Sequence, residues 1–236
     1  MLCPSWGESK AKKLAAVVEL ADAEDSEADV SPDIHDREFL RRRLRLPYFP
    51  TRGALMADYI YVDNSNVFIE GKRVSAVAMG IAMNVYDAMN NRILDYDYKM
   101  SFGRLHEFVA GQDESKIARA VLFGSRPPPN DSIWKYAERA GFELVLEDRN
   151  VENKEKKIDT GIVSAMVKDA YKKMNPASDV IVLVAGDSDF VPAVRDLVED
   201  KFQVEVVFWD HVSKELRDIC TRFISLNPHL DYLALK

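Results

Sequence analysis

The sequence is poor in cysteine and contains no long apolar run. Its 236 residues include two cysteines, Cys3 and Cys220, too few for a disulfide framework or a cysteine-based zinc site. Any bound metal would therefore be held by oxygen ligands. No run approaches the roughly 18 to 20 apolar residues of a membrane helix, so we expect no membrane association. The amino terminus lacks the order of a signal peptide, because Glu19 and Asp22 interrupt its apolar part, and we expect a cytoplasmic protein.

An excess of positive charge is also missing. The chain has 39 acidic against 32 basic residues, a formal net charge of -7, and a pI of about 5.2. Domains that hold nucleic acid by overall electrostatic attraction are usually strongly basic. The composition therefore excludes capture of nucleic acid by bulk charge. Recognition at a local site, or through bridging cations, stays open.

The overall composition is that of an ordinary globular protein, with 47% hydrophobic and 30% charged residues. The chain divides into two regions with different sequence patterns. Residues 1–55 show no strand pattern, and an acidic run there precedes four arginines within residues 41–45 and a proline-rich exit. We expect an irregular or partly helical extension with a helix around residues 35–46, and an RNA-binding arm is the alternative. Residues 56–236 are expected to form the folded domain.

From residue 57 onward, apolar runs of strand length alternate with segments of helical length. Runs rich in β-branched and aromatic residues predict strands, and amphipathic spacing predicts the helices between them. This alternation indicates an α/β fold with a parallel sheet and right-handed crossovers. The expected strands are 59–62, 119–123, 143–146, 180–184, 204–208 and a short one at 223–225, and the expected helices are 74–89, 101–109, 131–140, 160–174 and 190–200.

Carboxylates follow the first and fourth expected strands. Asp63 ends the run YIYVD, and Asp187 and Asp189 follow the run VIVLVAG. In an open parallel sheet, ligands bind outside the carboxyl ends of the strands. Asp159 stands where the helix before the fourth strand returns to that edge. If the first and fourth strands are neighbours, the four carboxylates surround one crevice.

Carboxylates in one crevice repel one another unless they are protonated or bridged by cations. A set of oxygen ligands without histidine or cysteine favours Mg²⁺ or Mn²⁺. The predicted chemistry is metal-assisted phosphoryl transfer, in which the ion activates a water and neutralises charge on the phosphate. Asn64 and Asn66 add neutral oxygen donors that would orient carboxylates or a phosphate.

Each of these aspartates also has a structural alternative. Asp63 and Asp187 would serve as turn residues, Asp189 as a helix cap, and Asp159 as a first-turn carboxylate favoured by the helix dipole. The convergence of three separate segments on one edge weighs in favour of a shared site.

Three motifs resemble those of a known family. They are YVDNSNVFIEG at residues 61–71, KKIDTG at 156–161 and VLVAGDSDFVPAV at 182–194. They are similar to motifs of the NYN domain family, also described as LabA-like or DUF88 proteins, a branch of the PIN-like nucleases. The resemblance covers most of residues 57–226 and implies a PIN-like Rossmannoid three-layer sandwich. Its mainly parallel sheet has the order 3-2-1-4-5, which would make the first and fourth strands neighbours.

The resemblance also implies an activity, that of a metal-dependent endoribonuclease. By this resemblance, the catalytic and metal-binding residues are Asp63, Asp159, Asp187 and Asp189, with Mg²⁺ or Mn²⁺ as cofactor and Asn66 in support. RNA is the implied substrate.

One departure from the family pattern concerns the helix that follows Asp159. Many members carry a further aspartate six residues later, where this chain has Ala165. Asp169 is not expected to replace it, because ten residues along a helix is about 15 Å and turns away from the same face. A non-catalytic module that binds RNA or a protein partner is therefore the alternative to an enzyme.

Further residues are expected to contact RNA near this edge. Arg126, in the loop GSRPPPND, would contact phosphate, and Lys157 would line the substrate path, with structural or solvated loops as the alternatives. Asn64 and Ser188 complete the expected substrate-binding set. Because the net charge is negative, a homo-oligomer or a protein partner would supply basic surface. His211, after the fifth strand, is expected to be a loop or capping residue without a partner.

Overall fold

The computed structural model describes residues 57–111, 113–126, 132–148 and 155–235. The expected extension at residues 1–55, with its helix around 35–46, lies outside the described residues. Within the described ranges, no helix is both long enough and apolar enough to cross a membrane.

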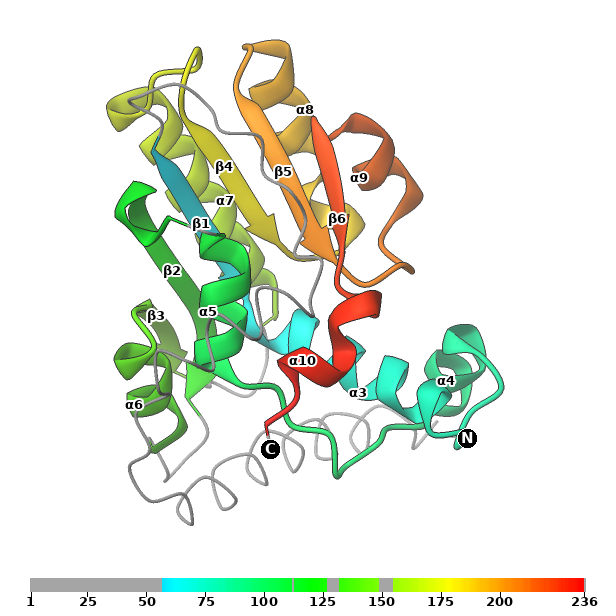
Figure 1. Ribbon diagram of the computed structural model, residues 1–236. Coiled ribbons are helices and arrows are strands. Elements are labelled where there is room, and N and C mark those ends of the chain that lie inside the picture. Colours follow the sequence, from blue (N-terminus) through cyan, green and yellow to red (C-terminus); the bar gives the residue numbers. More distant parts are fainter. Residues whose placement is uncertain (1–56, 112, 127–131, 149–154, 236) are drawn as a thin grey trace.

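One six-stranded sheet organises the described chain, and every neighbouring pair of strands is parallel (Figure 1). The order is β3-β2-β1-β4-β5-β6, so β1 lies between β2 and β4. This confirms the expected α/β class and strand order, and β6 extends the sheet beyond β5. The strands are β1 (Asp58–Asp63), β2 (Ile117–Arg126), β3 (Glu143–Asp148), β4 (Val180–Val184), β5 (Gln203–Phe208) and β6 (Arg222–Ser225).

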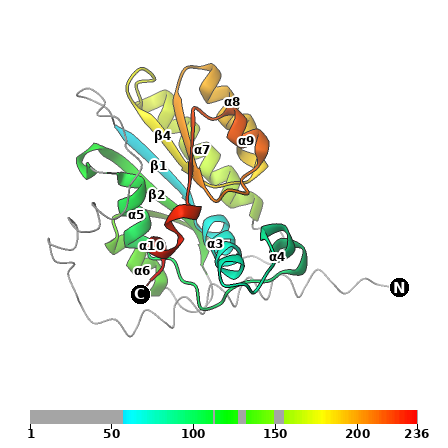
Figure 2. The same ribbon diagram turned by 45° about the vertical axis from the view of Figure 1, so that its right-hand side comes forward.

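Helices cover both faces of this sheet. Helices α7 and α8 lie on one face, and α5 and α10 lie on the other (Figures 1 and 2). All five residues of β4 are buried, as expected for a central strand covered on both sides. The helices are α3 (Asn64–Ala78), α4 (Val85–Asn91), α5 (Phe102–Ala110), α6 (Ser132–Arg139), α7 (Glu155–Lys173), α8 (Val191–Glu199), α9 (Lys214–Ile219) and α10 (Leu230–Leu233), with short 3-10 turns η1 (Glu114–Lys116), η2 (Ser188–Phe190) and η3 (Asn227–His229).

The first helical region differs from the expectation. The sequence predicts one helix over 74–89, but α3 begins directly after β1 and α4 is a separate helix. Asp63 starts α3 as its N-cap, because its carboxylate accepts the backbone N–H of Asn66 at 3.0 Å. Gly80, with a φ of 71°, follows the end of α3, and the side chain of Asn84 caps α4. The prediction of a single helix there is therefore wrong.

A buried charged network joins α7 to β1 and β2. Asp169 is 1% exposed, and its carboxylate accepts hydrogen bonds from the Tyr61 hydroxyl at 2.9 Å and the Lys173 ammonium at 2.8 Å. The guanidinium of Arg119 binds the same carboxylate and also binds Glu143 on β3. Asp169 therefore holds α7 against the sheet, in agreement with the expectation that it does not serve the carboxylates at the strand ends.

We expect Asp169→Asn to lower the free energy of unfolding by about 2 kcal/mol at neutral pH. Burial raises the pKa of the Asp169 carboxyl, but the hydrogen bonds from Lys173, Arg119 and Tyr61 outweigh burial and hold the pKa below its ordinary value. A lowered pKa stabilises the fold above the ordinary value of 3.8, and this gain is lost as the pH falls through the folded-state pKa. Urea unfolding should therefore show that the free energies of unfolding of the wild type and Asp169→Asn approach each other as the pH falls below about 4.

Glu143→Gln is the matched control for this experiment. Glu143 binds the same guanidinium, but its side chain is 54% exposed. We expect Glu143→Gln to change the free energy of unfolding of the protein by about 0.5 kcal/mol or less. Equal losses in the two variants would contradict a special role for the buried carboxylate.

Candidate functional site

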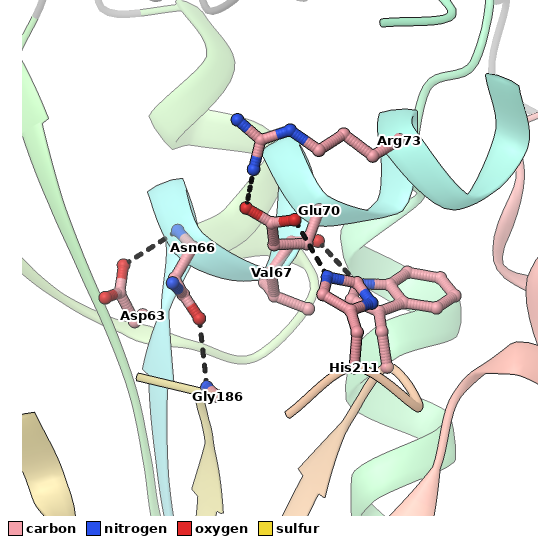
Figure 3. Close-up of polar contacts among 8 residues, drawn as sticks. Asp63, Asn66, Val67, Glu70, Arg73, Gly186 and His211 are labelled. Carbon is pink, nitrogen blue, oxygen red and sulfur yellow. Dashed lines mark hydrogen bonds and ion pairs between the residues drawn. The ribbon is translucent and has the colours of Figure 1, made fainter. Parts of the chain in front are cut away.

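The site begins where β1 ends and α3 starts. Asp63 is 4% exposed, and its carboxylate accepts the backbone N–H of Asn66 at 3.0 Å (Figure 3). It also accepts the hydroxyl of Ser65 at 3.0 Å. Burial raises the pKa of the Asp63 carboxyl and the negative charge of Asp187 adds to this, although the two hydrogen bonds act in the opposite direction. Asp63 thus holds a poorly solvated carboxylate close to a second one.

Asn66 joins α3 to the segment after β4. Its side-chain oxygen accepts the N–H of Gly186 at 2.9 Å, and Gly186 directly precedes Asp187 (Figure 3). The carbonyl of Gly186 accepts the N–H of Ser213 at 2.9 Å. Because the amide and the carbonyl of Gly186 are both bound, the chain that enters Asp187 is held beside α3.

Asp187, Ser188 and Asp189 are exposed where β4 leads through η2 into α8. Asp187 precedes η2 but makes no side-chain capping bond, and its carboxylate accepts a long hydrogen bond from the Ser188 hydroxyl at 3.4 Å. Phe190 is the N-cap of α8. The alternative of Asp189 as a helix cap is therefore wrong, and the carboxylate of Asp187 makes no capping hydrogen bond.

Asp159 approaches this edge from α7. The sequence predicts that Asp159 precedes the helix, but α7 begins at Glu155, since glutamate and lysine are good helix formers, and half-buried Asp159 lies one turn inside. The helix packs against β1 and η2. A Cβ at Gly161 would lie 3.8 Å from the Phe123 ring, and Phe123 pairs with Asp63 across β2 and β1. The beginning of α7 therefore lies over the ends of these strands.

The four predicted carboxylates thus lie at one edge of the sheet, and Asp63 and Asp187 interact electrostatically. Within the described ranges, no group of three or more histidine, cysteine, aspartate or glutamate residues stands close enough to hold a metal ion. A crevice surrounded by all four carboxylates stays a prediction.

The other predicted contact residues are placed unequally. Ser188 is exposed at the site, whereas Asn64 is 5% exposed, and its side-chain oxygen has no hydrogen-bond partner in the described part of the chain. Its burial favours a structural role over contact with substrate. The side chains of Arg126 and Lys157 lie outside the described residues, so their phosphate contacts stay predictions. Ala165 packs against the hydrophobic core and supplies no polar group.

A nearly enclosed pair beside the site was missed by reasoning from the sequence. His211 places Nε2 2.8 Å from the Glu70 carboxylate, and Arg73 binds the other oxygen of that carboxylate (Figure 3). Burial opposes ionisation of Glu70, but His211 and Arg73 outweigh burial and hold the pKa of Glu70 below its usual range. The expectation that His211 has no partner is therefore wrong. No local pattern signals this contact, because the two residues are 141 positions apart.

Comparison with known structures agrees with this fold. The chain is similar to a solved protein of unknown function, VPA0982 from Vibrio parahaemolyticus RIMD 2210633, with a TM-score of 0.53 and 20% sequence identity. The match covers 76% of this chain and 96% of that chain. At this identity, the likeness concerns the fold alone. No curated protein matches the sequence of this chain.

The family is shown by the sequence itself. The NYN domain model matches residues 59–227, which is more than half of the chain and spans the sheet from β1 to β6. The matched range contains the four aspartates at the strand edge. The chain therefore belongs to the NYN domain family, within the PIN-like nuclease superfamily.

Proposed function

We propose that this protein is a divalent-metal-dependent endoribonuclease. The observation that carries the proposal is the place of Asp63 and Asp187 at the ends of the adjacent strands β1 and β4, where the charge of Asp187 helps to raise the pKa of Asp63. One carboxylate is buried with a raised pKa, and the other is exposed and caps no helix through its side chain. Negative charge gathered in this way favours a cation. Membership of a nuclease-like family supports hydrolysis of a phosphodiester.

The residues at this edge fit Mg²⁺ or Mn²⁺ chemically. Both ions prefer oxygen ligands, and the candidate residues offer carboxylate oxygens. When bound, such an ion supplies a Lewis acid that lowers the pKa of a water and neutralises charge on the scissile phosphate. The proposed metal-binding and catalytic residues are Asp63, Asp159, Asp187 and Asp189.

The chain's own groups do the remaining work. Asp63 orients the attacking water, and the bonds from Asn66 and Ser65 hold its carboxylate in place. The side-chain NH2 group of Asn66 and the hydroxyl of Ser188 donate to phosphate oxygens, while Arg126 and Lys157 supply positive charge along the RNA path. Because the chain has a net charge of -7, a second copy or a protein partner supplies further basic surface.

A cleavage assay with the full-length protein tests this proposal. Labelled single-stranded RNA, structured RNA and single-stranded DNA are each incubated with the protein in Mg²⁺, Mn²⁺ or EDTA. We expect internal cleavage of RNA with either ion and none in EDTA.

A second candidate function is a non-catalytic module that binds RNA or a protein partner. The observation in its favour is Ala165, which packs against the core at a position where many family members carry another aspartate. If folded protein binds RNA but cleaves nothing with any ion, the nuclease proposal is contradicted and the binding module takes its place.

A further inference from the structure

The peptide that precedes Asp187 belongs to a closed ring of contacts. Asn66 of α3 binds the N–H of Gly186, and the N–H of Ser213 binds its carbonyl. Ser213 lies in the loop between β5 and α9, which comprises residues 209–213. The ring closes if this loop is itself fastened to α3.

Two side chains of the loop make that connection. The indole N–H of Trp209 donates to the carbonyl of Val67 at 2.9 Å. His211 Nε2 lies 2.8 Å from Glu70 (Figure 3). Because the pKa of Glu70 is lowered, its carboxylate is the acceptor and the imidazole Nε2–H is the donor. Trp209 is 0% exposed and the His211 side chain is 6% exposed, so both contacts are shielded from water.

Asn66 and Glu70 are four residues apart, which places them on one face of α3. That face therefore holds the segment after β4 through Asn66 and the loop after β5 through Glu70. Arg73 binds the second oxygen of Glu70 and fixes the direction of the carboxylate. The two attachments of Gly186 are tied to each other through a single helix.

We infer that Glu70 and His211 form a positioning pair that sets the place of Asp187 beside Asp63. When the pair is present, Gly186 is held on both sides, and the next residue has little freedom. When the pair is lost, the loop that carries Ser213 keeps the bond from Trp209 to Val67 and the bond from the Asp210 N–H to Asn227 but loses its second side-chain attachment to α3, so one of the two attachments of Gly186 loosens. The consequence for cleavage rests on the proposed function, whereas the consequence for Gly186 does not.

Hydrogen exchange on the full-length protein tests the positioning role without any reference to catalysis. We expect Glu70→Ala to speed exchange of the Gly186 and Ser213 amides by about tenfold or more. Glu70→Gln keeps an acceptor for His211 and should restore most of the protection. Exchange in β2 and β3 should not change. If Glu70→Ala fails to fold, His211→Asn, which leaves Glu70 bound to Arg73, takes its place.

Glu215→Ala is the control for removal of an ion pair. It breaks the ion pair between Glu215 of α9 and Arg195 of α8. The two side chains are 59% and 46% exposed, respectively. This pair has no part in the ring around Gly186. We expect the exchange of Gly186 to be the same in this control as in the wild type.

A Mn²⁺ titration of RNA cleavage supplies the functional readout. We expect the Mn²⁺ concentration for half-maximal cleavage to rise about tenfold in Glu70→Ala, with a smaller change in the rate at saturating Mn²⁺. A merely structural loss would reduce the rate without moving the Mn²⁺ dependence. Unchanged exchange at Gly186 would overturn the positioning role, and faster exchange with unchanged Mn²⁺ dependence would overturn its link to the site. If the wild type cleaves nothing at any Mn²⁺ concentration, the proposed function has failed, and the exchange result still decides the positioning role.

Discussion

Asp63→Asn is expected to reduce metal-dependent RNA cleavage by about 100-fold or more, while making the protein more stable at neutral pH. The substitution removes the charge that would bind the ion and orient the attacking water. It also removes a buried charge that burial and Asp187 disfavour. The amide oxygen of asparagine can still accept the N–H of Asn66, so the start of α3 is retained.

The pH dependence of this stabilisation has a definite sign. Since the folded-state pKa of Asp63 is raised, the native state binds the proton more tightly than the unfolded chain does. The wild type has this contribution below the ordinary pKa of 3.8 and loses it as the pH rises through the folded-state pKa. The two proteins should therefore differ little near pH 4, and Asp63→Asn should be the more stable at about pH 7.

Thermal unfolding in EDTA at both pH values measures the effect, and the RNA assay in Mn²⁺ measures cleavage. Asp210→Asn is the control, because Asp210 is likewise an aspartate after a strand, but it is exposed and is not among the proposed ligands. We expect it to change neither property. An Asp63→Asn protein that still cleaves at the wild-type rate, or that is less stable than the wild type at neutral pH, would contradict the role given to Asp63.

Gly186→Ala is expected to lower the free energy of unfolding by about 3 kcal/mol and to abolish cleavage. A Cβ at this position would lie 2.1 Å from the ring of Phe208, which is 2% exposed. A closely packed ring has no free space into which it can move. Either the ring or the segment after β4 must shift, and the second outcome moves Asp187 away from Asp63.

Gly103→Ala provides the matched control for this substitution. Gly103 lies in α5, and the nearest atom to an added Cβ would be 3.8 Å away. Alanine is also the better helix former, so stability should be equal or slightly higher. Urea unfolding compares the two variants. A loss of stability in Gly186→Ala no larger than in Gly103→Ala would show that the segment after β4 is not closely packed.

The sheet could be predicted from the sequence because its strands are short, buried and rich in β-branched residues. The start of α3 could not. Asp63 and the polar residues after it have the composition of a turn, but the same residue types cap helices. Gly71 also weakens the helical pattern, and the structure gives its reason: a Cβ there would lie 2.9 Å from the ring of Trp209. Trp209 lies directly after β5, far from Gly71 in the sequence.

The edge that holds the candidate site was predictable for a topological reason. The carboxyl ends of parallel strands lie at the same edge of a sheet. Because β1 and β4 are neighbours, Asp63 and Asp187 come to that edge together. The burial of Asp63 and the contact of His211 with Glu70 were not predictable, because both depend on how α3 lies against two loops after it leaves the sheet. The spacing of residues in the sequence carries no information about how α3 is oriented against these loops.

Cleavage of labelled RNA by the wild type and by Asp187→Asn, side by side in saturating Mn²⁺, tests the carboxylate site most directly. Asp187 is exposed and makes no capping bond, so its substitution should leave the fold intact by circular dichroism. We predict that the wild type cleaves RNA and that Asp187→Asn loses about 100-fold or more of this activity. Equal cleavage by the two proteins would contradict the assignment of these carboxylates as the catalytic site.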